Sequence, residues 1–314
     1  MAEKIATREA YGNTIAEIGE KYSDMVVLDA DLSKSTFTCK FAEKFPDRFF
    51  NMGIAEANLT SVAAGLASCG KIPFVSTFAI FATGRAYDQV RNSIAYPNLN
   101  VKIAATHAGI SVGEDGASHQ SIEDIALMRA IPGMTVICPA DGIETALAVK
   151  AVVEYKGPVY LRLGRLALPT VYDNPEACKF EIGKSITLQE GTDATIIATG
   201  LMVQEAIEAH KILQNEGINV RIINMHTIKP IDEKAIIDAA YQTGRIVTAE
   251  EHSIVGGLGE AVASITARSC PVPIAMVGVK DVFGRSGKPA ELLKHYGLTA
   301  SDIVTAVKSL FKKE

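Results

Sequence analysis

Short apolar runs rich in β-branched residues alternate with amphipathic stretches along the first half of the chain. The apolar runs, which predict strands, lie at 25–29, 48–52, 72–76, 101–106, 135–138 and 159–163. The amphipathic stretches, which predict helices, lie at 7–22, 54–69, 79–95, 122–130 and 143–155. Because the connections are short, this alternation predicts right-handed βαβ units and a mostly parallel sheet covered by helices on both faces.

The alternation stops after residue 165 and begins again near residue 194. Residues 166–191 contain two prolines, a Tyr-Asp-Asn-Pro turn signal and little periodicity, so we interpret them as an interdomain linker. Beyond it, strands predicted at 194–199, 220–224, 245–249 and 274–277 alternate with helices at 203–216, 232–241 and 254–268, and a helical tail follows. We therefore expect two α/β domains, at 1–185 with the linker and at 186–314.

Composition narrows the class of protein but names no function. Hydrophobic residues make up 48% of the 314 residues and charged residues 21%, a balance typical of globular proteins. The formal net charge of −5 argues against nucleic acid or an anionic membrane as the main partner, because either usually requires a basic surface. No apolar run reaches the ~20 residues of a membrane span. The N-terminal segment lacks the apolar core of a signal peptide, so we expect a cytoplasmic protein.

The cysteines indicate neither a disulfide framework nor a zinc site. They are Cys39, Cys69, Cys138, Cys178 and Cys270. Because their number is odd and no Cys-x-x-Cys spacing occurs, we expect reduced thiols and no metal bound by this chain.

Residues 106–120 form the densest polar segment, with two histidines, Glu114, Asp115 and three glycines between a predicted strand and a predicted helix. Ligands of open α/β sheets bind at the carboxyl ends of the strands, so this loop lies where a site is expected. His107 and His119 could hydrogen-bond hydroxyl groups or transfer protons near neutral pH. The alternative is a solvated turn whose glycines serve only the backbone. Metal binding is the less favoured interpretation, because the histidines and carboxylates are separated by glycines and do not form a ligand pair on one helix or strand.

Three further residues lie where a predicted strand gives way to a helix. Glu56 opens a nearly apolar helix, and taken alone it is an ordinary partner of the helix dipole. Phe78 and Phe81 lie three residues apart and can share one helical face, either as core or as a stacking platform.

Other polar residues after strands have equally ordinary interpretations. Asp31 and Ser35 lie in a typical capping and turn sequence. Arg165 could hold an anion through two hydrogen bonds or form a surface ion pair. The Gly-Gly-Leu-Gly turn at 256–259 resembles a phosphate-binding turn only weakly, and we interpret it as structural.

The order of these motifs resembles the second half of transketolase, a thiamine diphosphate enzyme that transfers a two-carbon ketol unit between sugar phosphates. The strings are Gly-Ile-Ala-Glu-Ala, Ser-Thr-Phe-Ala-Ile-Phe, Thr-His, Gly-Glu-Asp-Gly-Ala-Ser-His-Gln and Leu-Gly-Arg, and the resemblance covers essentially the whole chain. The first domain of a full-length transketolase binds the diphosphate and metal through Gly-Asp-Gly and a downstream Asn. No Gly-Asp-Gly occurs here. The chain thus resembles the C-terminal subunit of a split transketolase, with a pyrimidine-binding domain and a transketolase C-terminal domain.

The resemblance implies a role for each matching residue. Glu56 matches the catalytic glutamate that hydrogen-bonds N1′ of the aminopyrimidine. Phe81 matches the aromatic residue that stacks on this ring, Phe78 lines the same pocket, and Asp31 lies near the thiazolium. The substrate-binding residues that the resemblance implies are Asp115 and His119 for sugar hydroxyls and Arg8, Ser35, His107 and Arg165 for phosphate, with His107 and His119 also catalytic.

The resemblance also implies partners and leaves rivals open. It implies an N-terminal diphosphate-binding subunit that holds Mg²⁺ or Ca²⁺, and an α2β2 heterotetramer as the smallest assembly. The rivals are a deoxyxylulose-phosphate synthase-like subunit, the β-type subunit of a 2-oxo acid dehydrogenase, and a non-catalytic regulatory subunit. In one segment the match fails: residues 82–87 carry an extra residue, so no role is assigned there.

Overall fold

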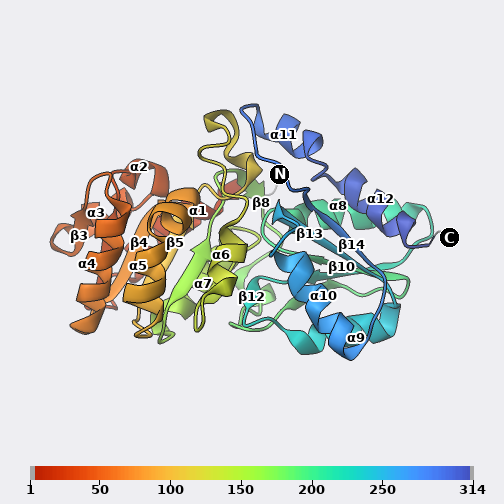
Figure 1. Ribbon diagram of the computed structural model, residues 1–314, viewed down its shortest axis with the longest axis horizontal. Helices are drawn as coiled ribbons and strands as arrows, with labels where there is room; N and C mark the ends of the chain where they lie inside the picture. The colour runs from red at the N-terminus through yellow and green to blue at the C-terminus, as the bar shows by residue number, and fades with distance from the viewer. Residues whose placement is uncertain (1–3, 312–314) are drawn as a thin grey trace.

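The computed structural model describes residues 4–311, which form two sheets of mostly parallel strands flanked by helices (Figure 1). The first sheet has seven strands in the order β12-β6-β7-β5-β4-β2-β3. Its strands are β2 (Met25–Asp29), β3 (Phe49–Asn51), β4 (Ile72–Phe78), β5 (Lys102–Thr106), β6 (Thr135–Ile137), β7 (Val159–Arg162) and β12 (Thr227–Lys229). All pairs except β6–β12 are parallel, so the predicted fold class is confirmed here.

Helices cover both faces of the first sheet because its strands alternate their side chains between two cores. Val26 and Leu28 of β2 lie in the same core as residues of α4, whereas Met25 and Val27 lie in the core with residues of α1 and α7. The helices of this half are α1 (Thr7–Ile18), α2 (Ser33–Thr36), α3 (Cys39–Lys44), α4 (Glu56–Ser68), α5 (Tyr87–Gln89), α6 (Asp124–Ala130) and α7 (Gly142–Glu154).

The second sheet has five strands in the order β14-β13-β10-β11-β9. They are β9 (Ile186–Gln189), β10 (Ala194–Ala198), β11 (Val220–Asn224), β13 (Ile246–Ser253) and β14 (Ile274–Val279), and only β9 runs antiparallel. The flanking helices are α8 (Met202–Asn215), α9 (Glu233–Thr243), α10 (Leu258–Ser269), α11 (Pro289–His295) and α12 (Ala300–Ser309).

The predicted linker and one of the predicted helices differ from the structure. The segment interpreted as a linker contains two strands: β8 (Ala167–Pro169) pairs with β1 (Lys4–Ala6), and β9 forms an edge of the second sheet. The helix predicted at 79–95 is broken into a π-helix (Phe81–Arg85), α5 and a second π-helix (Val90–Ala95). Each π turn takes up one residue more than an α turn. The extra residue noticed in the sequence after Phe81 therefore lies where the helix widens.

The two halves of the chain exchange structure across their boundary. β12 belongs to the second half of the sequence, yet it extends the first sheet, and its Ile228 packs in the core around α4. In return, Ile110 and Ala140 of the first half pack in the core around α8 and α12. Buried side chains and a strand thus cross the boundary between the two halves. The division at residue 185 stays a prediction.

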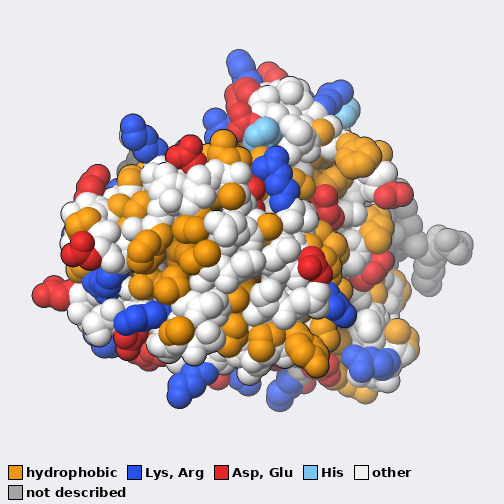
Figure 2. All heavy atoms as spheres, turned by 60° about the vertical axis from the view of Figure 1, so that its left-hand side comes forward, with side chains coloured by type: hydrophobic (Ala, Val, Ile, Leu, Met, Phe, Trp, Pro, Cys, Tyr) orange, Lys and Arg blue, Asp and Glu red, His pale blue; other side chains and the backbone are white. Residues whose placement is uncertain are grey.

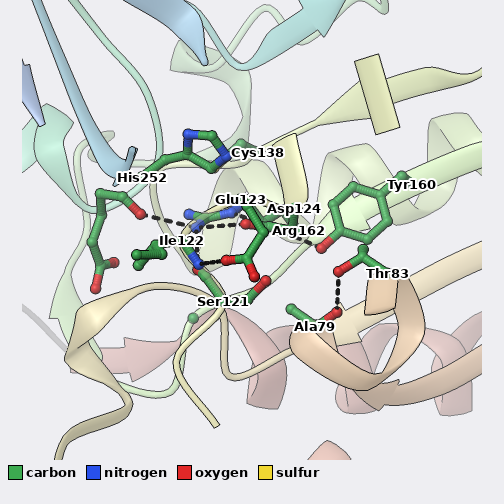
Figure 3. Close-up of polar contacts among 12 residues, drawn as sticks. Ala79, Thr83, Ser121, Ile122, Glu123, Asp124, Cys138, Tyr160, Arg162 and His252 are labelled. Carbon is green, nitrogen blue, oxygen red and sulfur yellow. Dashed lines mark hydrogen bonds and ion pairs between the residues drawn. The ribbon is translucent and has the colours of Figure 1, made fainter. Parts of the chain in front are cut away.

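A buried ion pair lies where the two sheets meet (Figure 3). Arg162, at the end of β7, donates through Nε and Nη2 to the carboxylate of Asp124 at 2.7 and 3.2 Å. The same guanidinium donates to the carbonyl of Glu251 in β13 at 2.9 Å, which carries the contact into the second sheet. Tyr160 adds a hydrogen bond to Asp124 at 2.7 Å.

This arrangement keeps Asp124 ionised. Burial alone would raise the pKa of Asp124, but the charge and hydrogen bonds of Arg162 hold it below its ordinary value. A carboxylate whose pKa is lower in the folded than in the unfolded chain stabilises the fold at higher pH. Its contribution is lost only as the pH falls below the ordinary Asp value of about 3.9.

Removing this carboxylate charge should destabilise the whole chain. We expect Asp124→Asn to lower the free energy of unfolding by about 3–5 kcal/mol, because Arg162 would keep a buried charge without a partner. Urea unfolding followed by circular dichroism measures this change. Asp238→Asn, which removes an exposed carboxylate paired with Lys234, is the control and should leave the midpoint nearly unchanged. Equal midpoint shifts in both variants would contradict the role given to the pair.

Candidate active site

The candidate site residues follow the carboxyl ends of neighbouring parallel strands. β7, β5, β4 and β2 are adjacent in the first sheet and run in the same direction. Arg165, His107, Phe78 and Asp31 lie at or just after the ends of these strands, in that order. The parallel register therefore brings residues that are far apart in the sequence to one edge of the sheet, where ligands of open α/β sheets bind.

Phe78, Phe81, His107 and His119 form one aromatic cluster. The His107 ring stacks on Phe78 with centroids 3.8 Å apart, and the rings of Phe78 and Phe81 lie nearly parallel at 5.9 Å. His119 meets Phe81 edge-on at 5.3 Å. The structure thus brings the histidines of the polar loop to the phenylalanine pair, as a site formed by both would require. Phe78 is buried, whereas Phe81 remains partly accessible.

His107 is held in a conformation that few residues adopt. Its backbone φ is 56°, in the left-handed region, and its Nδ1 lies 2.9 Å from the Thr106 hydroxyl. Backbone strain of this kind is concentrated at functional sites, so the observation points to a role beyond packing. Burial, reinforced by the positive charges of Arg8 and Arg165, lowers the pKa of His107 to about 3. The ring is consequently neutral at physiological pH.

Glu56 is a buried carboxylate in contact with a cation. It begins α4 and is 5% exposed, as the apolar helix behind it indicated. Arg85 donates from Nη1 to its Oε1 at 3.0 Å, and the Arg85 guanidinium carbon lies 4.2 Å from the centroid of the Phe81 ring. Glu56 and Phe81 therefore contact the same guanidinium, which belongs to the last residue of the π-helix (Phe81–Arg85).

Arg85 is the residue near the site that the sequence analysis missed. It lies in the segment where the extra residue made the match fail, so no role was assigned to it. The signal that could have found it is its spacing, because a residue four positions after Phe81 in a helical turn shares its face.

A second group of polar side chains joins α1, α2 and the end of the first domain. Arg8 donates to the carbonyl of Ser35 at 2.6 Å and to the carbonyl of Arg165 at 3.3 Å. The Arg165 guanidinium donates to Glu114 at 3.2 Å and to the carbonyl of Val112. Two arginines near His107 form a positive site suited to an anionic group, and the exposed Glu114 now neutralises part of it.

The polar loop is held in place by the second domain. A carboxyl oxygen of Glu251 in β13 accepts the backbone N–H of Ser111 at 2.5 Å. Gly109 has a φ of 86°, and a Cβ there would lie 2.3 Å from the Glu251 carboxyl carbon, so only glycine fits. Gln120 braces the other end by donating to the carbonyls of Ile110 and Arg285. The loop is thus a structured element and not only a solvated turn.

The two aspartates of the candidate site lie at its accessible edge. Asp31 is exposed with a φ of 63°, and its carboxylate accepts a hydrogen bond from the Asn51 amide at 3.0 Å. Buried Asp29 fixes this turn by accepting from the Leu32 N–H and from the hydroxyls of Thr36 and Thr38. Asp115 is exposed, and no hydrogen bond of its side chain is found among residues 4–311.

The Gly-rich turn at 256–259 serves the protein itself, as the sequence indicated. The Glu250 carboxylate accepts the backbone N–H groups of Leu258 and Gly259 at 2.7 and 2.8 Å, and so occupies the N-terminus of α10. Burial raises the pKa of Glu250 to about 7. A phosphate would have to displace this carboxylate, so the turn offers no free anion site.

Between residues 4 and 311, no three His, Cys, Asp or Glu side chains gather as ligands for a metal ion. No helix of this part of the chain has the length and apolar character needed to cross a membrane.

Comparisons with known proteins agree with this geometry. The family model "Transketolase, pyrimidine binding domain" matches residues 3–170, and "Transketolase, C-terminal domain" matches residues 183–303. A protein of Methanocaldococcus jannaschii named as a transketolase C-terminal section is 54% identical over 98% of this chain and 96% of its own. The chain belongs to the transketolase family.

Two further comparisons place it among split members of that family. A 6-deoxy-6-sulfo-D-fructose transketolase subunit of Clostridium sp. is 43% identical over 98% of this chain and 95% of that protein. A solved structure described as a split gene transketolase, inactive β4 tetramer, is 56% identical and superimposes with a TM-score of 0.91 over 98% of both chains. The predicted membership, as a C-terminal section of transketolase, is confirmed.

The neutral state of His107 in this transketolase section can be tested directly. We expect the His107 ring to stay neutral from pH 8 down to about pH 5, because its pKa in the folded chain is about 3. Ring-nitrogen NMR on chain labelled at histidine, with His107→Gln for assignment, measures the titration. A midpoint near the ordinary value of about 6.5 would contradict the burial and charge argument. Since the folded state binds fewer protons, this residue should also destabilise the fold as the pH drops below 6.5.

Proposed function

We propose that this chain is the catalytic C-terminal subunit of a two-polypeptide transketolase, transferring a two-carbon ketol unit from a ketose phosphate to an aldose phosphate with thiamine diphosphate. The observation that carries the proposal is that the buried carboxylate of Glu56 and the ring of Phe81 contact one and the same planar group, the Arg85 guanidinium. When bound, the cofactor supplies carbanion stabilisation at its thiazolium. The protein side chains would bind and orient the cofactor and the substrate, and hold or move protons at the atoms they contact.

The residues present fit the aminopyrimidine half of that cofactor. Glu56 offers a buried carboxyl oxygen that already accepts a planar N–H donor, and Phe81 already stacks on a planar cation. Phe78 completes the aromatic wall behind Phe81. In this assignment Glu56 holds the ring nitrogen N1′ and exchanges a proton there, and Asp31 lies toward the thiazolium.

The positive site fits the phosphate end of a sugar phosphate. Arg8 and Arg165 supply the charge, the neutral His107 supplies a hydrogen bond, and Ser35 lies next to Arg8, which donates to its carbonyl. The relative named for a 6-sulfo sugar supports an anionic group at this end of the substrate in the family.

The accessible loop residues fit the sugar hydroxyls. Asp115 is exposed, and His119 stands at the edge of the Phe81 ring, so both can reach a ligand that binds over the cluster. His119 and His107 can then hold or move protons at these hydroxyls.

A second polypeptide would bind the diphosphate and its Mg²⁺ or Ca²⁺. The exposed positions of α4, at Asn58, Ser61, Gly65 and Ser68, are uncharged, and Ile54 and Tyr96 are 76% and 90% exposed. Figure 2 shows the side of the molecule that carries these elements, with broad hydrophobic and uncharged areas between the charged side chains. A face of this kind is suited to a protein interface. The relative described as an inactive β4 tetramer supports a requirement for a partner, and we propose an α2β2 assembly.

The rival functions lack this support. The two relatives described above are named as a transketolase C-terminal section and a transketolase subunit, names that agree with the proposed function and not with the rivals. A regulatory subunit would not need a buried carboxylate, a strained neutral histidine and two arginines at one sheet edge.

The deciding experiment follows the proton at C2 of bound thiamine diphosphate. In enzyme reconstituted with the partner subunit, Glu56→Gln should slow the exchange of this proton by about 10²–10⁴, the usual loss when a positioned acid or base is removed. Quenched deuterium labelling with NMR detection measures the rate.

Two controls accompany this measurement. Glu20→Gln removes an exposed glutamate and should exchange at the wild-type rate. The chain without its partner should show no accelerated exchange. Wild-type exchange in Glu56→Gln would return Glu56 to the status of an ordinary helix-start glutamate.

The phosphate assignment is tested by comparing substrates. Arg165→Ala should raise KM for phosphorylated sugars about ten- to a hundred-fold, since a charge-assisted hydrogen bond contributes about 1.5–3 kcal/mol. Unphosphorylated analogues should be nearly unaffected. Glu114→Gln, which removes the anion now paired with Arg165, is the matched variant and should not raise KM. Equal losses with both substrate types would mean that Arg165 only holds the loop.

A further inference from the structure

Arg85 makes two contacts that no other described residue makes together. Its guanidinium donates to the buried Glu56 carboxylate at 3.0 Å and lies over the Phe81 ring at 4.2 Å from the centroid. A guanidinium is flat, carries N–H donors at its rim and stacks on aromatic faces. In form and in polarity it resembles a protonated aminopyrimidine.

The two groups that Arg85 contacts are those assigned above to the aminopyrimidine ring. The same carboxylate oxygen and ring face cannot serve both at once. We propose that Arg85 is an internal occupant of the aminopyrimidine site, which must swing out before the cofactor can bind and so sets the affinity of the site. This inference rests on the proposed function.

The position of Arg85 explains how it reaches the site. The π-helix (Phe81–Arg85) begins at the stacking phenylalanine and ends at the arginine, and it packs against α4, which begins with Glu56. The π-helix therefore carries both Arg85 and Phe81, one of the two groups that Arg85 contacts.

The surroundings of Arg85 explain how it can leave. Its side chain is 55% exposed, whereas that of Glu56 is 5% exposed. Among residues 4–311, the Arg85 side chain has no hydrogen bond other than that to Glu56. Solvent can thus receive the displaced guanidinium. While the site is without a ligand, the arginine supplies the partner that a buried carboxylate requires.

If Arg85 occupies the site in most molecules, the apparent Kd for thiamine diphosphate equals the intrinsic Kd divided by the fraction of molecules in which the site is open. Isothermal titration of the assembled two-chain enzyme with thiamine diphosphate and saturating Mg²⁺ measures this affinity. We expect Arg85→Gln to lower Kd about tenfold, as it would if the site is open in about a tenth of wild-type molecules. Arg85→Lys keeps the charge but not the flat stacking group, so its Kd should lie between those of wild type and Arg85→Gln.

Arg91→Gln is the matched control. Arg91 lies on the second π-helix and is exposed, and its side chain hydrogen-bonds only Asn92 among the residues described. Its replacement should leave Kd unchanged. An unchanged or higher Kd in Arg85→Gln, with normal binding by wild type, would overturn this inference and leave the proposed function standing. If wild type and all variants fail to bind the cofactor, both are overturned.

Discussion

The pairing of Arg162 with Asp124 is the interaction on which the arrangement of the site depends. Both side chains are buried, and neither charge could remain there without the other. The same guanidinium holds the carbonyl of Ser121, at the end of the polar loop, and the carbonyl of Glu251 in β13. One side chain thus contacts the second sheet and holds one end of the loop that carries the histidines.

The loop is therefore a product of both domains, although its sequence belongs to the first. Glu251 accepts the Ser111 N–H, and Gln120 donates to the Arg285 carbonyl, so each half of the loop is tied to the second domain. The strained backbone of His107 persists because the surrounding contacts determine it. This explains why a second α/β domain accompanies the one that holds the candidate catalytic groups.

Much of this could be predicted from the sequence, and the failures have physical causes. The long strands of both sheets were evident because they are buried on both faces and read as apolar runs. β9 and β12 were missed, since the first has a half-exposed alternating pattern and the second is only three residues long.

The candidate site was likewise predictable only in part. Strand order placed His107, Phe78 and Arg165 at one edge, and their grouping was predictable from the parallel fold. The contact of Arg85 with Glu56 was not, because it depends on a π turn whose length no local propensity specifies.

The strand exchanged between the halves has a consequence for how this protein could evolve or be divided. β12 covers the outer edge of β6, and Lys229 at its end donates to the carbonyls of Arg129 and Ile131. Without it, the first sheet would end in a bare row of backbone N–H and C=O groups, open to pairing with another chain. The second domain therefore shields its neighbour from aggregation, and a gene split between the two domains would remove that protection, whereas a split ahead of both preserves it.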